Sequence, residues 1–369
     1  MNVLVGSTAA GDLLDRVTAA LYGLAIGDAL GMPTQLMSRQ QIRESFGEID
    51  GFRAATDGHP IAAGLPAGRI TDDTEQALLL AYALIAGDGH VDPEGFASAL
   101  IAWEDDMRAR GSLDLLGPST KAAVAAVLAG VPVEQAGRFG TTNGAAMRVT
   151  PVGIARRCIS IREPDQLGGA AERGDAGPPG SEAALGAPDA LEALIDLVVE
   201  AGLVSHNTSI AIAGAAAVAA AVSVGIDGAS IQESIAVAIR AAARGRERGN
   251  WIAGADVSRR IEWAVSLVRA DDPAASLRDI AELVGTSLAT QESVPAAFGV
   301  LALYGDDPWR ACCTAASLGG DTDTIAAMVG AMAGACGGMG SWPDAAVETV
   351  QRVNGLDLAP LGAQLLALR

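Results

Sequence analysis

Two short stretches of the sequence combine paired aspartates with threonines. Residues 71–74 have the sequence TDDT and residues 321–324 have the sequence DTDT, and each stretch directly precedes an apolar segment of helical character. Carboxylate and hydroxyl oxygens are the hard ligands that Mg²⁺ and Mn²⁺ favour. Taken alone, the first stretch is better explained as a helix start, with Asp72 as the N-cap and Glu75 completing a capping box.

Capping accounts for only one aspartate at each helix start, because only one residue can be the N-cap. It does not account for four carboxylates in two threonine-flanked pairs. Bringing both pairs together would leave unbalanced negative charge, which is costly unless cations neutralise it. Two divalent ions, about 3.5–4 Å apart, would neutralise it and leave positions open for water and substrate. Together, the two stretches favour a binuclear metal site.

Two further polar segments stand at the start of helical segments. Residues 140–144 (GTTNG) form a glycine-bearing loop whose free N–H groups could bind an anion. An ordinary cap by Asn143, with Arg148 in a structural ion pair, explains the same residues. Residues 205–208 (SHNT) precede an alanine-rich segment, and a histidine such as His206 in that place is more often structural than catalytic. Neither segment identifies a site by itself.

The elements that must position these residues are helices. Apolar residues recur with helical spacing over most of the chain, and Gly and Pro separate the segments. No alternating run is long enough to predict a strand, so we expect an all-α fold, a compact orthogonal helical bundle that forms one domain over residues 1–369. The predicted helices are Leu13–Leu30, Glu75–Ile85, Pro93–Arg108, Ser119–Leu128, Ala190–Ala201, Thr208–Val224, Ile231–Ala243, Val257–Val268, Leu277–Val284, Trp309–Ser317, Thr324–Ala335 and Ala345–Val353.

One segment does not fit this pattern. Glu163–Pro188 collects Gly, Pro, Ala and acidic residues, which predicts a surface insertion. The polar motifs lie on both sides of it, so one site must be assembled across the insertion.

Composition excludes several classes of function. The formal net charge of −19 argues against a nucleic-acid surface. Ile210–Ile226 is alanine-rich, which indicates a buried core helix rather than a membrane span. The N-terminus lacks the pattern of a signal peptide, and the four cysteines have no CxxC spacing, so we expect a cytoplasmic protein with reduced thiols. The three histidines form no close pair, which argues against a histidine-rich zinc site.

Five motifs together resemble the ADP-ribosylglycohydrolase family, which includes the dinitrogenase reductase-activating glycohydrolase. They occur in the family's order at residues 23–35 (GLAIGDALGMPTQ), 68–81 (GRITDDTEQALLLA), 143–153 (NGAAMRVTPVG), 205–217 (SHNTSIAIAGAAA) and 317–328 (SLGGDTDTIAAM). The pair formed by TDDT and GGDTDT is the specific part of the resemblance. It implies a compact all-α fold, two Mg²⁺ or Mn²⁺ ions, and cleavage of ADP-ribose from a modified side chain.

The resemblance also implies roles for individual residues. Apart from the resemblance, we expect Asp72 or Asp321 to accept a proton from the attacking water, with Asp114 as a candidate general acid. Gln35 and His206 would line the substrate pocket. Residues of the phosphate-binding loop would be Gly140, Thr141, Thr142, Asn143 and Gly144. The metal ligands would be Thr71, Asp72, Asp73, Asp321, Asp323 and Thr324.

Two positions differ from the family pattern. Family members that act on ADP-ribosylated proteins commonly have a glutamate where this chain has Gln35, four residues after Gly31. Many also have an aspartate where this chain has Leu115, and Asp114 stands one residue out of register. An amide cannot act as a carboxylate base or ligand. These differences concern the leaving group rather than the metal site.

Two alternatives to an ADP-ribosyl hydrolase therefore stay open. One is a hydrolase of small N-ribosides or nucleosides, suggested by Gln35 and Leu115. The other is a catalytically silent protein that binds ADP-ribose or metal. The four intact aspartates, Asp72, Asp73, Asp321 and Asp323, favour an enzyme over the silent protein.

Overall fold

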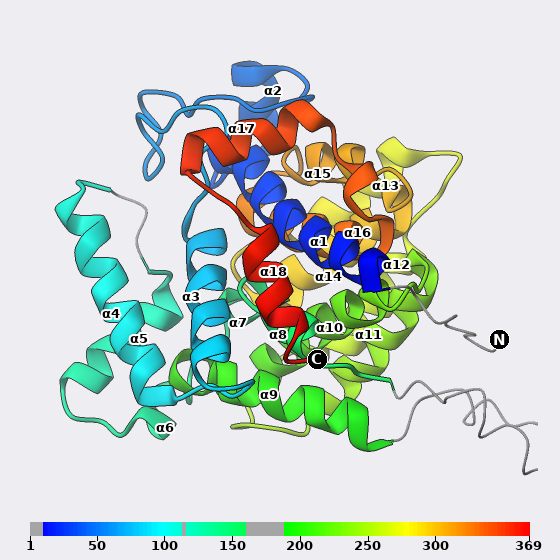
Figure 1. The fold of residues 1–369 in the computed structure, drawn as a ribbon. Coiled ribbons are helices and arrows are strands. Elements are labelled where there is room, and N and C mark those ends of the chain that lie inside the picture. Colours follow the sequence, from blue (N-terminus) through cyan, green and yellow to red (C-terminus); the bar gives the residue numbers. More distant parts are fainter. Residues whose placement is uncertain (1–9, 113–115, 160–187) are drawn as a thin grey trace, which may run out of the picture.

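The computed structural model describes residues 10–112, 116–159 and 188–369, and within these ranges the protein is built from helices (Figure 1). Their only β-type pairings are two isolated bridges, Thr142 with Ala289 and Thr208 with Asn250. The predicted all-α fold is confirmed. The elements in chain order are α1 (Ala10–Gly31), η1 (Met32–Thr34), α2 (Arg39–Phe46), α3 (Asp72–Ala86), α4 (Pro93–Ala109), α5 (Pro118–Leu128), α6 (Val133–Ala136), α7 (Gly144–Met147), α8 (Thr150–Ala155), α9 (Pro188–His206), α10 (Ser209–Ile226), α11 (Ile231–Gly245), α12 (Val257–Ser266), α13 (Pro273–Asp279), η3 (Ile280–Val284), α14 (Thr290–Tyr304), α15 (Pro308–Ala315), α16 (Thr322–Gly337), η4 (Met339–Ser341), α17 (Asp344–Asn354) and α18 (Ala359–Leu366).

Helices α1 and α16 pack against each other with their backbones in direct contact. Gly23, Gly27 and Gly31 are spaced four residues apart, so they share one face of α1. A side-chain carbon at Gly27 would collide with the carbonyl of Ala326, and one at Gly31 would collide with the backbone of Asp323. The close packing brings the end of α1 to the start of α16, where the second aspartate pair lies.

Helix α10 is the buried centre of the fold. All of its residues are buried, and it packs against α7, α8, α9, α11 and α16. In the described part of the chain it is also the one helix long and apolar enough to cross a membrane, and it lies wholly inside the protein. The prediction of a buried core helix for this segment is confirmed.

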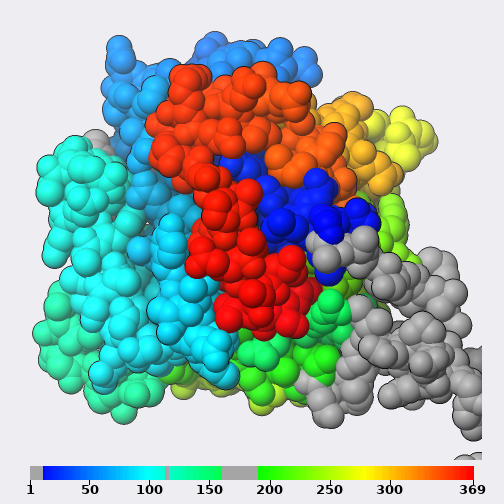
Figure 2. Space-filling model, in the orientation of Figure 1, coloured from blue at the N-terminus to red at the C-terminus, as the bar shows by residue number. Residues whose placement is uncertain are grey.

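One large hydrophobic core joins the described segments, with members from Val17 in α1 to Leu365 in α18. Helices α4, α5 and α6 lie together beside α3 at one edge of the molecule (Figure 1). On the face shown in Figure 2, α17 and α18 lie across the surface over α1. The predicted insertion at Glu163–Pro188 falls outside the described residues, except for Pro188, which begins α9.

Helix α14 was not predicted, and Pro295 in its interior is the reason. A proline lacks the N–H that would bond to the carbonyl of Gln291, four residues earlier. The guanidinium of Arg260 donates to that carbonyl instead, with an Nε–O distance of 2.5 Å. A side chain from α12 therefore replaces the missing backbone bond, and the helix continues through the proline.

Candidate active site

The first aspartate pair lies at the start of α3. Thr71, not Asp72, is the N-cap, and its hydroxyl accepts a hydrogen bond from the backbone N–H of Asp73. Asp72 is the first residue of the helix and is half-buried, whereas Asp73 is buried. Capping therefore uses the threonine hydroxyl and not either carboxylate.

Asp28 of α1 fixes the TDDT segment in place. Its carboxylate accepts hydrogen bonds from the backbone N–H groups of Thr71 and Thr74, at 3.0 and 3.1 Å. It also accepts from the hydroxyls of the same two threonines, at 2.7 and 2.5 Å. Burial raises the pKa of Asp28 to about 6, against the lowering effect of these hydrogen bonds.

The sequence analysis did not identify Asp28, although a signal was present. It is the one charged residue between Val17 and Leu30, a mainly apolar stretch of the predicted helix. A buried carboxylate needs partners, and the threonines of the TDDT motif are those partners.

The second aspartate pair is held by a glycine turn and by the segment before α14. Gly320 has a positive φ of 79°, and a side chain there would also collide with Thr286. The backbone N–H of Asp321 donates to the carbonyl of Thr286 at 2.8 Å. The side-chain amide of Asn143 donates to the Asp321 carboxylate at 2.5 Å. The 140–144 loop is therefore tied directly to the second aspartate pair.

The two aspartate pairs converge on Asp73. The Thr324 hydroxyl donates to Oδ2 of Asp73 at 3.3 Å, which links the two motifs. Burial raises the pKa of Asp73 well above its ordinary value, and the nearby carboxylates of Asp323, Asp72, Asp28 and Asp321 raise it further. Burial also raises the pKa of Asp321 to about 6.

This cluster fits divalent cations in chemistry. Within the described ranges, Oδ1 of Asp73 is buried and has no hydrogen-bond partner. Several buried carboxylates with two hydroxyls form an oxygen-only donor set of the kind that Mg²⁺ and Mn²⁺ prefer. As the side chains stand, no group of three or more Asp, Glu, His or Cys residues in the described part of the chain is arranged so that it could hold a metal ion. The structure therefore shows converging donors rather than a closed coordination shell.

A cavity of about 300 Å³ opens beside the cluster. Four of the six predicted metal ligands line it: Asp72, Asp321, Asp323 and Thr324. Four of the seven predicted substrate residues also line it: Gln35, Thr142, Asn143 and Gly144. Thr71 and Asp73 lie in the cluster just behind, and Gly140, Thr141 and His206 are not part of the lining. Leu116 lines the cavity, but Asp114 and Leu115 lie outside the described residues.

His206 lies behind the cavity wall. Its ring is fully buried, and its Nε2 lies 3.0 Å from the hydroxyl of Thr142. A side chain at Gly144 would collide with the ring, so a glycine is required where the loop passes it. Burial lowers the pKa of His206 well below its ordinary value, and the charge of Arg148 lowers it further. His206 therefore supports the loop as a neutral imidazole.

Gln35 is held at the cavity by its backbone. The ring Nδ1 of His59 accepts hydrogen bonds from the N–H groups of Ile61 and Ala62, so Nε2 carries the proton and donates to the Gln35 carbonyl at 2.9 Å. The side-chain amide nitrogen of Gln35 is buried and has no hydrogen-bond partner among the described residues. A donor group at the cavity is thus left for a ligand.

The sequence analysis also did not single out Lys121. It is the only lysine in the chain, and it lines the cavity at an exposed position in α5. In a protein with a net charge of −19, Lys121 places a local positive charge at this cavity.

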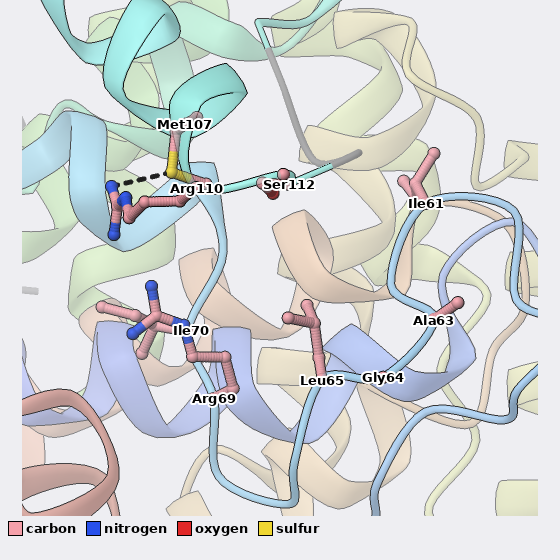
Figure 3. Close-up of a pocket in the computed structure, with 10 residues that line it drawn as sticks. Ile61, Ala63, Gly64, Leu65, Arg69, Ile70, Met107, Arg110 and Ser112 are labelled. Carbon is pink, nitrogen blue, oxygen red and sulfur yellow. Dashed lines mark hydrogen bonds between the residues drawn. The ribbon is translucent and has the colours of Figure 1, made fainter.

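A second cavity, of about 460 Å³, lies on the other side of Ile61, which lines both cavities. Figure 3 shows the side chains of Arg69 and Arg110 on one side of it and those of Ile61 and Leu65 on the other. Both arginines pair with Glu75, at 2.6 and 3.6 Å, and Arg110 also pairs with Asp106. The ion pairs account for these charges, and none of the predicted site residues lines this cavity.

Comparison with known proteins shows a consistent set of relatives. The ADP-ribosylglycohydrolase family profile matches residues 9–369. The uncharacterized protein YegU of Escherichia coli is 34% identical over 93% of this chain and 94% of its own. The ADP-ribosylarginine hydrolase Tri1 of Pseudomonas putida is 34% identical over 39% of this chain and 37% of its own. A solved structure described as an ADP-ribosylglycohydrolase-related protein complex has a TM-score of 0.63, covers 97% of this chain and 98% of its own, and is 24% identical, which supports the fold.

Proposed function

Because the chain belongs to the ADP-ribosylglycohydrolase family, we propose that it is a metal-dependent hydrolase of ADP-ribosylated side chains or related ADP-ribosyl compounds. Family membership supports hydrolysis of a glycosidic bond. The observation that carries the metal dependence is the convergence of two aspartate pairs on Asp73, next to a cavity.

The proposed cofactor is a pair of Mg²⁺ or Mn²⁺ ions. When bound, such ions would supply Lewis acidity and neutralise the clustered carboxylates. The residues that would hold them are Thr71, Asp72, Asp73, Asp321, Asp323 and Thr324. The buried Oδ1 of Asp73 supports this assignment, because a buried carboxylate oxygen without a partner is costly in the absence of a cation.

The chain's own residues would bind and orient the substrate. The loop at residues 140–144 and Lys121 would hold the diphosphate, since residues 142–144 of the loop and Lys121 line the cavity and Lys121 supplies positive charge. Asp72 or Asp321 would accept the proton of the attacking water as positive charge develops at the anomeric carbon. Asp114 remains a candidate for the general acid.

A turnover assay tests the proposal. Purified protein is incubated with ADP-ribosyl-arginine, ADP-ribosyl-serine and a panel of nucleosides, with Mg²⁺ or Mn²⁺ and after chelation. We expect release of ADP-ribose from at least one ADP-ribosyl compound, and loss of that activity after chelation. Turnover of nucleosides alone would favour the small-riboside hydrolase that Gln35 suggests. Tight binding of ADP-ribose without turnover of any compound would favour the silent protein.

The proposal also covers the location of the protein and its partners. We expect a cytoplasmic enzyme that acts on an ADP-ribosylated protein or a small ADP-ribosyl compound. The net charge of −19 makes nucleic acid an unfavourable partner.

A further inference from the structure

Arg148 is a fully buried arginine that lies behind the cavity rather than in its lining. One terminal nitrogen donates to the side-chain carbonyl of Gln76 at 3.0 Å. The other donates to the hydroxyl of Ser205 at 2.5 Å. The guanidinium also lies over the ring of Phe96, 5.4 Å from its centroid. Both partners of its terminal nitrogens are neutral, although a buried cation gains most from a carboxylate.

The first hydrogen bond of Arg148 connects it, through Gln76, to Asp72, one of the proposed metal ligands. The amide of Gln76 has one carbonyl, which accepts from Arg148, and one NH₂ group, which donates to Oδ2 of Asp72 at 2.8 Å. The arginine therefore sets which way the Gln76 amide is turned. An amide turned the other way would place its NH₂ group against the guanidinium and its carbonyl against the Asp72 carboxylate.

The second hydrogen bond of Arg148 connects it to Thr142, by way of Ser205 and His206. The Ser205 oxygen accepts from Arg148 and lies 2.8 Å from Nδ1 of His206. Among the hydrogen bonds of the described residues, this nitrogen is the one acceptor offered to the Ser205 proton, so the proton is assigned to this bond. A neutral imidazole carries one proton, which then lies on Nε2 and is donated to the Thr142 hydroxyl oxygen. The proton of Thr142, which lines the cavity, is left to donate to a ligand.

We propose that Arg148 is a positioning residue that orients two cavity groups at once: the Asp72 carboxylate through Gln76, and the Thr142 hydroxyl, as a donor to an anionic oxygen of the ligand, through Ser205 and His206. The proposal rests on the proposed function for the identity of that ligand, the diphosphate of an ADP-ribosyl group. The direction of the hydrogen bonds is a property of the protein alone.

The direction of the hydrogen bonds from Ser205 to His206 and from His206 to Thr142 can be detected by NMR spectroscopy. The ring nitrogens of a histidine have distinct ¹⁵N shifts when protonated and unprotonated, and the chain has only three histidines to assign. We expect His206 of the ligand-free protein to carry its proton on Nε2. In Ser205→Ala, which removes the hydroxyl between Arg148 and the ring, we expect the single Nε2–H form to be lost. A proton on Nδ1 in the wild type, or an unchanged Nε2–H form in Ser205→Ala, would overturn the proposal.

Ligand affinity gives the second readout, with free ADP-ribose as the probe in calorimetry. Thr142→Val removes the hydroxyl and should weaken binding about tenfold, whereas Thr142→Ser retains the hydroxyl and should bind nearly as the wild type does. Arg148→Lys keeps the charge but not the two-pronged geometry. It should weaken binding to a similar extent and change the His206 signature. Arg156→Lys, at a partly buried arginine at the end of α8, is the matched control and should change neither.

Failure of this proposal and failure of the proposed function are distinguishable. If the wild type neither binds ADP-ribose nor hydrolyses any ADP-ribosyl compound, the proposed function fails, while the His206 signature still tests the arrangement around Arg148. If the wild type binds ADP-ribose and folded Arg148→Lys keeps both full affinity and the wild-type signature, Arg148 has only a structural role. If Arg148→Lys does not fold, Ser205→Ala decides by the same two measurements.

Discussion

The backbone of Gly31 lies directly against the backbone of Asp323, with no room for a methyl group between them. Gly31→Ala should therefore force α1 away from α16 and lower the free energy of unfolding by about 1–3 kcal/mol. Urea unfolding followed by circular dichroism measures this change. Gly202→Ala in α9 is the control, because a methyl group there meets no atom within 4 Å. Equal stability of the two variants would contradict the close packing.

Asp73→Asn should stabilise the metal-free protein and weaken its binding of metal. Removing one of several neighbouring negative charges should raise the free energy of unfolding in chelator by about 1 kcal/mol. The same change removes a proposed ligand, so added Mn²⁺ should raise the melting temperature of the wild type but not of the variant. Activity that depends on divalent metal should be lost, as also in Asp72→Asn, Asp321→Asn and Asp323→Asn. Wild-type metal affinity in the Asp72/Asp321 double variant would rule out the binuclear site.

Asp28→Asn tests the residue that holds the TDDT segment. The variant places an NH₂ group where a carboxylate oxygen accepts from Thr71 or Thr74, so one buried hydrogen bond becomes a donor–donor contact. We expect a loss of about 1–3 kcal/mol of stability and a ten- to hundredfold loss of metal affinity. Asp50→Asn, at an exposed ion pair with Arg53, should change stability by less than about 0.5 kcal/mol. Unchanged metal affinity in Asp28→Asn would show that Asp28 serves the fold alone.

Lys121 can be tested chemically because it is the only lysine in the chain. If its ammonium binds the diphosphate, ADP-ribose should slow acetylation of Lys121, as measured by peptide mass spectrometry. Lys121→Gln should weaken ADP-ribose binding several-fold, and the loss should shrink at high salt because an exposed charge is screened. Adenosine, which has no phosphate, is the control ligand and should give no protection. Equal acetylation rates with and without ADP-ribose would remove Lys121 from the binding site.

Gln35 bears on the choice of leaving group. The arginine side chain leaves as a guanidine that takes up a proton to become a cationic guanidinium. Nearby carboxylates stabilise that cation most, and Gln35 and Leu115 are not carboxylates. We predict that ADP-ribosyl-arginine is a poor substrate, cleaved about ten- to a hundredfold more slowly than a better ribosyl linkage. Gln35→Glu should reduce this difference in cleavage rate. Efficient wild-type cleavage of ADP-ribosyl-arginine, unimproved by Gln35→Glu and lost in Asp114→Asn, would show that Asp114 restores arginine specificity.

The motifs at helix starts were predictable because their signals are local. TDDT and DTDT each precede an apolar helical segment, and the structure places both at helix N-termini, where capping and first-turn geometry fix the chain within a few residues. The buried helix over Ile210–Ile226 was predictable for the same reason, since its composition alone distinguishes it.

Other features depend on residues far apart in the sequence and were not predicted. The role of Asp28 requires that α1 pass α3, and the continuity of α14 through Pro295 requires Arg260 from another helix. The place of His206 behind Thr142, rather than in the cavity lining, depends on how α9 packs against the 140–144 loop. The spacing of residues along the chain does not show which of these distant segments pack together.

The pairing of α1 with α16 also has a consequence for synthesis. The hydroxyl of Thr322 donates to the carbonyl of Gly31 across a separation of 291 residues. At about 5–20 residues per second, the glycine face of α1 waits tens of seconds on the ribosome before its partner helix emerges. Throughout that time the face of α1 that carries Gly23, Gly27 and Gly31 lacks α16, the helix that covers it. Nascent chains of this protein should therefore depend on chaperones until α16 is released, and folding should complete late rather than helix by helix.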